Sequence, residues 1–199
     1  MFSSDIIDLL NQRDGGVGDE MKYAIFYLIK GKAEIYYKNI IKNIAKISGE
    51  KYLIDNPIPS HITLKYTFDA DKKQIKELEK IIGLFVKRQK KSKINIGGFN
   101  NFNKFVVYMD VKFSMEAKYV RNNLIKQIKH LSFIDIQDFD NNWKSHSTIG
   151  YGNSKKTFNL IWKYVQSIDK PNYDLNFDNI TIMKKPKKYW KLHRGFKLK

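Results

Sequence analysis

The chain has 199 residues, 42% of them hydrophobic, which is enough apolar material for a sizeable buried core. It has no cysteine, so disulfides, thiolate zinc sites, iron–sulfur clusters and a cysteine nucleophile are excluded. The formal net charge of +17 favours an anionic partner. Because only four of the 37 basic residues are arginines, a lysine-rich composition also accounts for this excess, and the charge alone identifies no ligand.

The first twenty residues differ in character from the rest. A glycine-rich stretch at residues 14–20 predicts a flexible N-terminal lead-in over 1–20, and we expect one two-lobed domain over 21–199. The longest apolar run, residues 24–29, is far shorter than the roughly 20 residues of a membrane span. Residues 1–20 do not show the basic start followed by an apolar stretch that is typical of a secretory signal, so we expect none. We therefore expect a cytoplasmic protein that has no membrane partner and is a monomer.

The first half predicts alternating strands and helices. Residues 22–29 are rich in aromatic and β-branched side chains, which indicates a buried strand, and helical spacing of apolar residues follows over 35–47. A proline-containing loop over 55–60 separates this helix from a strand over 61–68, where apolar and polar residues alternate with period two. An amphipathic helix over 71–88 completes the half.

The second half predicts the same order of element types. In chain order we expect strands at 93–99 and 104–111, a helix at 115–131, an acidic loop at 138–142, a strand at 145–151, a helix at 157–168, and strands at 175–183 and 189–198 joined by a basic hairpin at 184–188. Both halves thus run strand, helix, strand, helix, strand. This repetition predicts an internal duplication about a pseudo-twofold axis.

Two short motifs occupy corresponding places in these halves: His61-Ile-Thr63-Leu64 and His146-Ser-Thr148-Ile149. Residues two apart in a strand project from the same face, about 6.5–7 Å apart, so each histidine has a hydroxyl beside it. Two such strands facing one cleft would supply a base, an acid and neutral donors for phosphoryl oxygens. This set predicts cleavage of a phosphodiester without a metal ion.

The tripeptide alone is a weak signal, because His130-Leu-Ser132 nearly repeats it. His130 falls near the end of a predicted helix, where a histidine more often complements the helix dipole than catalyses. The other two motifs lie on strands at corresponding places in the two halves of the chain. This placement, and not their composition, makes the pair a specific signal. Neither of their histidines sits in a cluster of His, Asp or Glu with metal-ligand spacing, so we expect no metal ion and no cofactor.

With these two motifs, the sequence resembles the 2H phosphoesterase superfamily, which includes 2′,5′-RNA ligase-like and cyclic nucleotide phosphodiesterase branches and is defined by two His-x-Thr/Ser-hydrophobic motifs. The resemblance covers residues 22–198. It implies a bilobal, duplicated α+β fold, in which two antiparallel sheets flank a central cleft and the helices lie outside. It also implies that His61 and His146 form the acid–base pair and that Thr63 and Thr148 hold the phosphate.

The sequence departs from the bacterial RNA ligase-like branch at one position. That branch carries an arginine two residues beyond the hydrophobic position of the second motif, where this chain has Tyr151 after Gly150. Tyr151 instead resembles more divergent members, including viral ones that cleave signalling oligonucleotides. This resemblance makes Tyr151 a candidate substrate-binding residue, although strict alternation along the strand would turn both Tyr66 and Tyr151 away from the histidines and into the core.

Three further residues are candidates for substrate binding. Strict alternation places Lys65 on the face of His61 and Thr63, where it would contact phosphate; the alternative is a solvated lysine at the strand end. Tyr189 and Trp190 follow the basic hairpin at 184–188 and could stack a base above a basic rim. They could equally be strand aromatics beside a solvated hairpin.

These observations predict a metal-independent phosphodiesterase. The expected substrates are a 2′,3′-cyclic phosphate at an RNA end, or small cyclic or 2′,5′-linked oligonucleotides; RNA ligation is a less favoured activity. One alternative is a basic RNA-binding protein with no chemistry, and another is a viral-type enzyme that degrades host signalling oligonucleotides. Simple electrostatic binding needs no threonine two residues after each histidine, so the motifs favour an enzyme.

Overall fold

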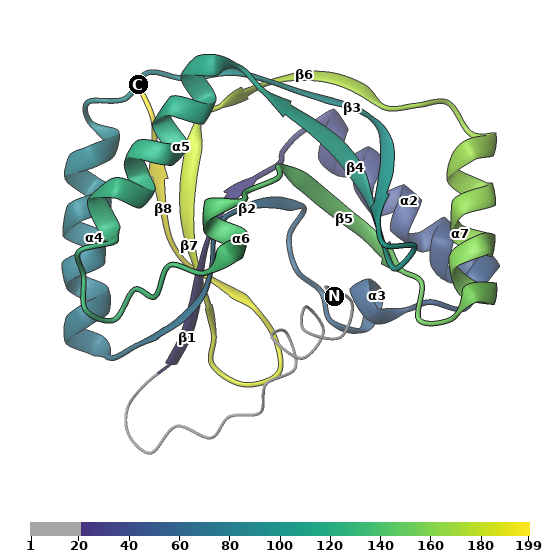
Figure 1. Ribbon diagram of the computed structural model, residues 1–199, viewed down its shortest axis with the longest axis horizontal. Coiled ribbons are helices and arrows are strands. Elements are labelled where there is room, and N and C mark those ends of the chain that lie inside the picture. Colours follow the sequence, from purple (N-terminus) through teal and green to yellow (C-terminus); the bar gives the residue numbers. More distant parts are fainter. Residues whose placement is uncertain (1–20) are drawn as a thin grey trace.

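The computed structural model describes residues 21–199, which form two four-stranded antiparallel sheets with six helices (Figure 1). Sheet A has the strand order β2-β1-β7-β8 and sheet B the order β5-β4-β3-β6. The strands are β1 (Met21–Leu28), β2 (His61–Ala70), β3 (Ser92–Phe102), β4 (Val106–Phe113), β5 (His146–Tyr151), β6 (Asn172–Phe177), β7 (Asn179–Lys185) and β8 (Lys191–Lys197). The helices are α2 (Lys32–Ser48), α3 (Tyr52–Asp55), α4 (Lys72–Val86), α5 (Met115–Ile128), α6 (Asp138–Asn141) and α7 (Lys155–Ser167).

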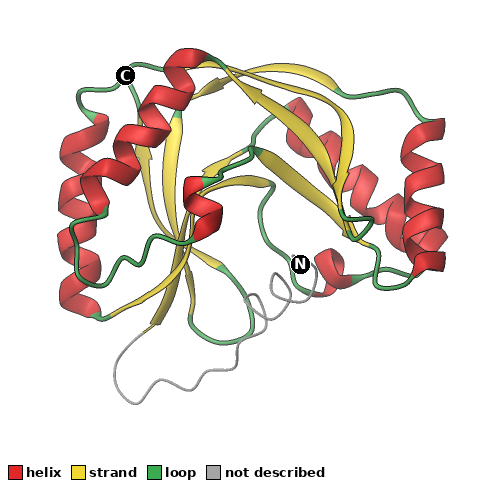
Figure 2. Ribbon diagram, in the orientation of Figure 1, coloured by secondary structure: helices red, strands yellow, loops and turns green. Residues whose placement is uncertain are grey.

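The predicted α+β fold, with two antiparallel sheets and outer helices, is confirmed (Figure 2). Helices α2 and α7 pack against each other and against β5, while α4 packs against α5 and β8. Helix α2 directly follows β1 of sheet A and yet covers sheet B, so the two lobes share an element. The predicted lead-in over 1–20 lies outside the described residues.

Two details of the prediction are wrong. The single strand expected at 175–183 is two strands in different sheets, because β6 pairs with β3 and β7 pairs with β1. Apolar and polar residues are mixed on both sides of Asp178, and the pairing partners reveal that the two sides belong to different sheets. The acidic loop expected at 138–142 contains the helical turn α6, in which the Asp140 side chain accepts a hydrogen bond from the backbone nitrogen of Gln137.

Local signals account for the ends of the longer helices. Asp71 begins α4 with a capping box, in which its carboxylate accepts hydrogen bonds from the backbone of residues 73 and 74 and the Gln74 side chain accepts one from the backbone nitrogen of Asp71. Ser114 and Ser154 cap α5 and α7 in a similar way. Helix α2 ends at Gly49, whose φ of 72° is readily available only to glycine.

One apolar core extends across both sheets. It contains Ile25 and Ile62 from sheet A together with Val107 and Ile149 from sheet B. Asn179 holds the entry to β7, because its side chain bonds both the nitrogen and the oxygen of the Leu28 backbone. Strands β2 and β5, which begin with the two histidines, therefore pack against one common core.

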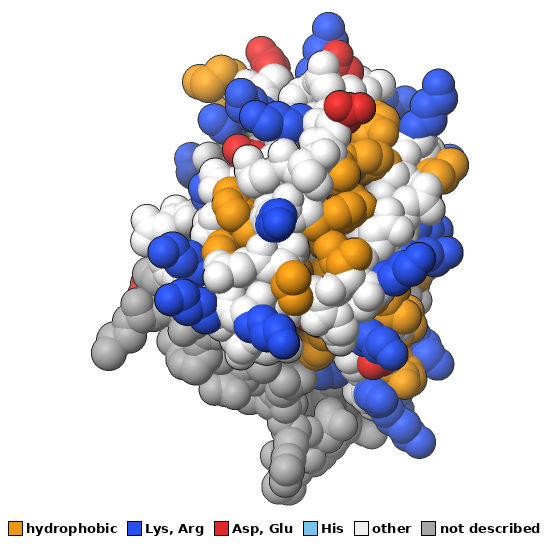
Figure 3. Space-filling model, turned by 90° about the vertical axis from the view of Figure 1, so that its right-hand side faces the viewer, with side chains coloured by type: hydrophobic (Ala, Val, Ile, Leu, Met, Phe, Trp, Pro, Cys, Tyr) orange, Lys and Arg blue, Asp and Glu red, His pale blue; other side chains and the backbone are white. Residues whose placement is uncertain are grey.

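The outer surface formed by α2 and α7 carries a stripe of apolar side chains among lysines (Figure 3). Ile35 and Ile47 on α2 and Leu160 on α7 are the large apolar side chains exposed there. Among the described helices, none is long and apolar enough to cross a membrane.

Candidate active site

The site forms where two edge strands meet. Strand β2 lies at one edge of sheet A and β5 at one edge of sheet B, and these two strands contact each other. Each begins with its histidine, His61 in β2 and His146 in β5, and both side chains are half-buried. The imidazoles are close enough for the charge of His146 to lower the pKa of His61. The predicted juxtaposition of the two motifs is therefore present in the structure.

Both imidazoles are oriented in the same way. Nδ1 of His61 lies 2.8 Å from the carbonyl oxygen of Pro59, and Nδ1 of His146 lies 2.8 Å from that of Lys144. A carbonyl oxygen only accepts hydrogen bonds, so Nδ1 carries the proton in each ring. This fixes the tautomer and leaves each Nε2 free to take up or release a proton.

A β-bulge follows each histidine–threonine pair. Thr63 lies opposite Phe26 and Lys65 opposite Ile25, so Leu64 is the extra residue in β2. In β5, Thr148 lies opposite Tyr108 and Gly150 opposite Val107, so Ile149 is the extra residue. The bulge thus occurs at the hydrophobic position of both motifs, and it reverses the faces of the residues that follow.

The bulge in β2 makes the predicted placement of Lys65 wrong. Lys65 shares the face of Ile25 rather than that of Thr63, and its side chain is completely buried. Its ammonium forms an ion pair of 2.8 Å with Asp140, so this side chain is not available to a substrate. Gly150 is the equivalent residue in β5, where a Cβ atom would come within 3.2 Å of Ile44.

The same reversal turns Tyr66 and Tyr151 toward the histidines, contrary to strict alternation. Tyr151 lies opposite Val106 on the face of Thr148, packed against Tyr52 and only 5% exposed. Burial raises its pKa, so the phenol stays neutral. Burial and the nearby charge of Asp140 raise the pKa of Tyr66 to about 12. A substrate-binding role for Tyr151 stays a prediction.

Aromatic rings border His61. The Phe26 ring stacks on His61 with centroids 4.0 Å apart, and half-buried Trp190 lies 5.9 Å from Phe26. Tyr189 is 40% exposed with Lys188 over its ring, and among the described residues its ring contacts neither histidine. Both Tyr189 and Trp190 precede β8 instead of lying in it. The structure therefore brings Trp190 to the site, and Tyr189 only to its neighbourhood.

Residues that the sequence analysis missed border His146. The rings of Phe102 and Tyr108 lie 4.9 and 5.2 Å from the imidazole, and Nζ of Lys144 lies 5.4 Å from each of these two rings. Tyr108 faces Thr148 across the strand pair, and its side chain is fully buried. Strand pairing places Phe102 and Tyr108 here, so no local sequence signal could have indicated them, whereas Lys144 lies only two residues before the second motif.

The surroundings keep both histidines neutral. Burial lowers the pKa of His61 to about 4, although the hydrogen bond to Pro59 opposes this shift. Burial also lowers the pKa of His146, aided by the charge of Lys144 and opposed by the hydrogen bond to Lys144 and by Asp110. In the free protein at pH 7 both Nε2 atoms are therefore proton acceptors. An anion bound between the rings would favour the protonated form of one of them.

A family model described as the 2'-5' RNA ligase superfamily matches residues 41–188. The chain belongs to this superfamily. Its members are 2H phosphoesterases, so the predicted family is confirmed, and membership supports a phosphoesterase activity in general. No curated protein matches the sequence.

Solved structures of similar fold extend over nearly the whole chain. LigT of E. coli complexed with 3'-AMP is 13% identical, with a TM-score of 0.59, and the match covers 91% of this chain and 99% of LigT. TT0787 of Thermus thermophilus is 12% identical, with a TM-score of 0.66, over 89% of this chain and 98% of that one. At this identity the likeness concerns the fold, which is that of the superfamily.

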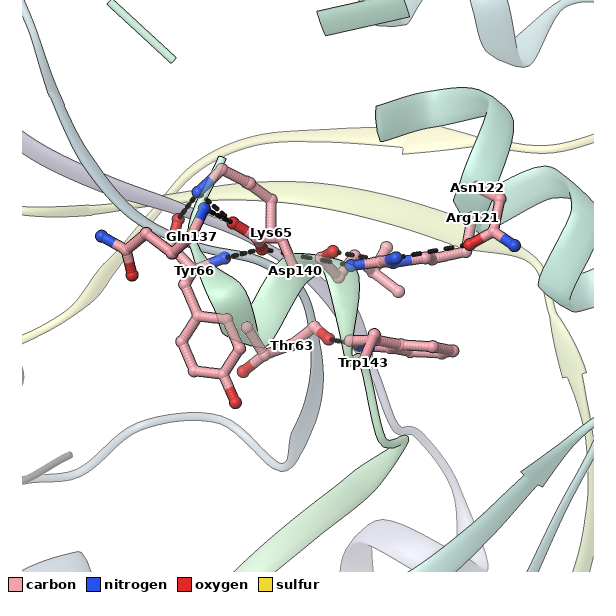
Figure 4. A network of polar contacts seen from close by, with 9 residues as sticks. Thr63, Lys65, Tyr66, Arg121, Asn122, Gln137, Asp140 and Trp143 are labelled. Carbon is pink, nitrogen blue, oxygen red and sulfur yellow. Dashed lines mark hydrogen bonds and ion pairs between the residues drawn. The ribbon is translucent and has the colours of Figure 1, made fainter. Parts of the chain in front are cut away.

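A buried polar network ties the two motif-bearing segments of this superfamily member together (Figure 4). Asp140 pairs with Lys65 and accepts a hydrogen bond of 3.2 Å from the backbone nitrogen of Tyr66, just beyond the first motif. Arg121 donates a hydrogen bond of 3.1 Å to the carbonyl oxygen of Leu64. The indole nitrogen of Trp143 donates a hydrogen bond of 2.7 Å to the carbonyl oxygen of Thr63, which connects β2 to the segment before His146.

In the part of the chain that the structure describes, no three His, Asp or Glu side chains come together in a way that could hold a metal ion. His130 lies exposed just beyond the end of α5. His193 pairs with Glu79 at a distance of 2.6 Å. The chemical groups gathered at the site are thus two imidazoles, two hydroxyls, aromatic rings and the ammonium of Lys144.

Proposed function

We propose that this protein is a phosphodiesterase in which His61 and His146 exchange protons with the substrate and Thr63 and Thr148 bind its phosphoryl oxygens. The twin orientation of the histidines supports the proposal most directly. Each ring donates its Nδ1 proton to a backbone carbonyl, which leaves two Nε2 atoms at one place, each beside a threonine of the same strand face. A purely structural role for the two histidines would not account for their matched geometry.

The proposed reaction is hydrolysis by general acid–base catalysis. One neutral imidazole takes a proton from water as the water oxygen attacks phosphorus. The other imidazole, protonated once the anionic substrate is bound, gives its proton to the ribose oxygen as the phosphorus–oxygen bond to that oxygen breaks. The threonine hydroxyls donate hydrogen bonds to the non-bridging oxygens, where negative charge develops.

We infer that the substrate is a nucleotide phosphodiester: a 2′,3′-cyclic phosphate at an RNA end, or a small cyclic or 2′,5′-linked oligonucleotide. Superfamily membership and the 3'-AMP complex of the similarly folded LigT support a nucleotide ligand. The half-buried Trp190 beside Phe26 supplies an aromatic surface on which a base can stack. Side chains of the protein supply the base, the acid and the hydrogen-bond donors of this scheme, so we propose that turnover needs no metal.

The test compares wild type with His61→Ala and His146→Ala on 2′,3′-cyclic nucleotides and 2′,5′-linked oligonucleotides, with EDTA present. We expect each substitution to lower kcat about 10²- to 10⁴-fold, the usual worth of one proton transfer. His130→Ala is the matched control, because His130 is exposed beyond α5, and it should keep the wild-type rate.

Unchanged turnover in both alanine variants would overturn the proposal. Salt-sensitive RNA binding with no turnover in the wild type would instead favour the binding protein considered from the sequence. Loss of wild-type turnover on adding EDTA, restored by a divalent cation, would contradict the metal-independent scheme alone.

A further inference from the structure

The proposed reaction develops negative charge on a phosphate, and the site needs a positive group to stabilise it. The two threonines are neutral, and both histidines are neutral in the free protein. Lys65 was the cation expected from the sequence, but its ammonium is buried in the ion pair with Asp140. The imidazole that becomes protonated on binding gives its proton away in the reaction, so a positive charge that persists has to come from another residue.

Lys144 is placed to supply it. Its side chain is exposed, and its ammonium lies 5.4 Å from the ring centres of both Phe102 and Tyr108, which also border His146. Its charge acts on His146, since it contributes to the lowered pKa of that imidazole. No carboxylate of the described residues forms an ion pair with Lys144, whereas Lys22 and Lys38 both have such partners.

The backbone that carries Lys144 is anchored to both motifs. Its carbonyl oxygen accepts the hydrogen bond from Nδ1 of His146. The residue before it, Trp143, donates its indole hydrogen to the carbonyl oxygen of Thr63 in the other lobe. The start of the Lys144 side chain is thus fixed relative to both histidines, and an ammonium held against ring faces keeps N–H donors for an anion.

We propose that Lys144 is a substrate-binding residue whose ammonium binds a non-bridging oxygen of the scissile phosphate on the His146 side of the site. The proposal rests on the proposed function. It assigns the neutralisation of the phosphate charge to a side chain outside both motifs, two residues before the second motif. The ligand chemistry is a phosphate group, either in a nucleotide or as the free anion.

The experiment measures binding of inorganic phosphate and of 3'-AMP by calorimetry, together with kcat/KM on a 2′,3′-cyclic nucleotide. The variants are Lys144→Met, which keeps the length and removes the charge, Lys144→Arg, which keeps the charge, and Lys118→Met, which removes an exposed charge on α5. We expect Lys144→Met to weaken phosphate binding and kcat/KM about 10- to 100-fold, the usual worth of a hydrogen bond to a charged group. The other two variants should stay within about threefold of wild type by the same scale.

A second readout does not depend on activity. The pKa of His146, measured by NMR, should rise in Lys144→Met, because a nearby positive charge is removed while Asp110 and His61 remain unchanged. It should stay at the wild-type value in Lys144→Arg. Circular dichroism checks that each variant is folded, and Lys144→Gln replaces Lys144→Met if the latter is not.

Three results would overturn the proposal: unchanged phosphate affinity in Lys144→Met, an equal loss in Lys118→Met, or a loss in Lys144→Arg as large as that in Lys144→Met. Its failure is distinguishable from failure of the proposed function. If His61→Ala abolishes turnover but Lys144→Met does not affect it, only the role of Lys144 is wrong. If the wild type cleaves no phosphodiester and yet binds phosphate through Lys144, the anion site stands and the reaction is wrong.

Discussion

The two histidines are held neutral by the same burial that brings them together. Because each Nδ1 is bound to a carbonyl oxygen, both rings present an unprotonated Nε2, which suits a base but not yet an acid. Their environments differ in one respect: Lys144 and Asp110 act on His146, whereas the charge of His146 itself acts on His61. The division of roles between acid and base therefore depends on which ring becomes protonated when the phosphate binds.

This lowering of both pKa values predicts an acid-shifted pH profile. The acid limb of kcat/KM reflects protonation of the base, and the alkaline limb reflects loss of the proton from the acid. Because both pKa values in the free protein lie below the ordinary 6.5, both limbs and the optimum should fall below pH 6.5. The measurement is kcat/KM on a cyclic nucleotide from about pH 3.5 to about pH 9, a range that brackets both titrations. A plateau that extends to about pH 8 or beyond would contradict this prediction.

At the scale of elements, the bulge after each motif decides which side chains reach the site. It keeps Thr63 and Thr148 beside their histidines and then sends Lys65 and Gly150 into the core. Gly150 leaves room there for α2 and α7, whereas Lys65 requires a buried counter-ion. The helical turn α6 provides that counter-ion, which makes Asp140 part of the support of β2.

The network around Asp140 predicts a large effect on stability. Asp140→Ala leaves the fully buried Lys65 without its partner, and removing one member of a buried ion pair typically costs about 3–5 kcal/mol of the free energy of unfolding. Urea unfolding should show this loss. The double variant Lys65→Met with Asp140→Asn removes the unpaired Lys65 charge but leaves the buried Arg121, 4.0 Å from Asp140, without its carboxylate, so we expect it to recover part of the loss. A loss below about 1 kcal/mol in Asp140→Ala would show that the ion pair does not support β2.

At the scale of the whole molecule, the buried histidines couple folding to pH. In the folded protein the pKa of His61 is about 4 and that of His146 is also lowered, against 6.5 when the chain is unfolded. Below pH 6.5 the unfolded chain binds more protons, so stability falls as pH falls. The contribution of these groups is fully present above pH 6.5 and is lost progressively down to about pH 4.

Replacing the histidines should therefore flatten the pH dependence of stability. We expect the free energy of unfolding of a His61→Gln, His146→Gln double variant to fall less than that of wild type between pH 6.5 and about pH 4, as measured by urea titration at each pH. The comparison with wild type cancels the contribution of Glu50, whose pKa is raised by burial and which is unchanged in the variant. Parallel curves for the two proteins would show that the histidines do not carry this coupling.

Local sequence determined much of this protein. The paired motifs, the helices from 35–47 to 157–168 and the cleanly alternating start of β2 are local patterns, and local patterns survive in the fold because propensity and spacing act over a few residues. The motifs at residues 61–64 and 146–149 also indicated the superfamily, because each motif consists of consecutive residues and is visible in the sequence itself. The crossing at Asp178, between β6 and β7, shows the limit of such patterns, since two adjacent segments of similar mixed apolar and polar sequence belong to different sheets.

The tertiary structure alone decided what surrounds the motifs. A bulge depends on how a strand pairs with its neighbour, so the positions of Lys65, Tyr66 and Tyr151 could not follow from alternation within one strand. Tyr108 reaches His146 and Lys144 only through the register of β4 against β5, which is a contact between residues distant in sequence. Periodicity reports which face of an element is apolar, whereas the partner of that face is set by packing of the whole chain.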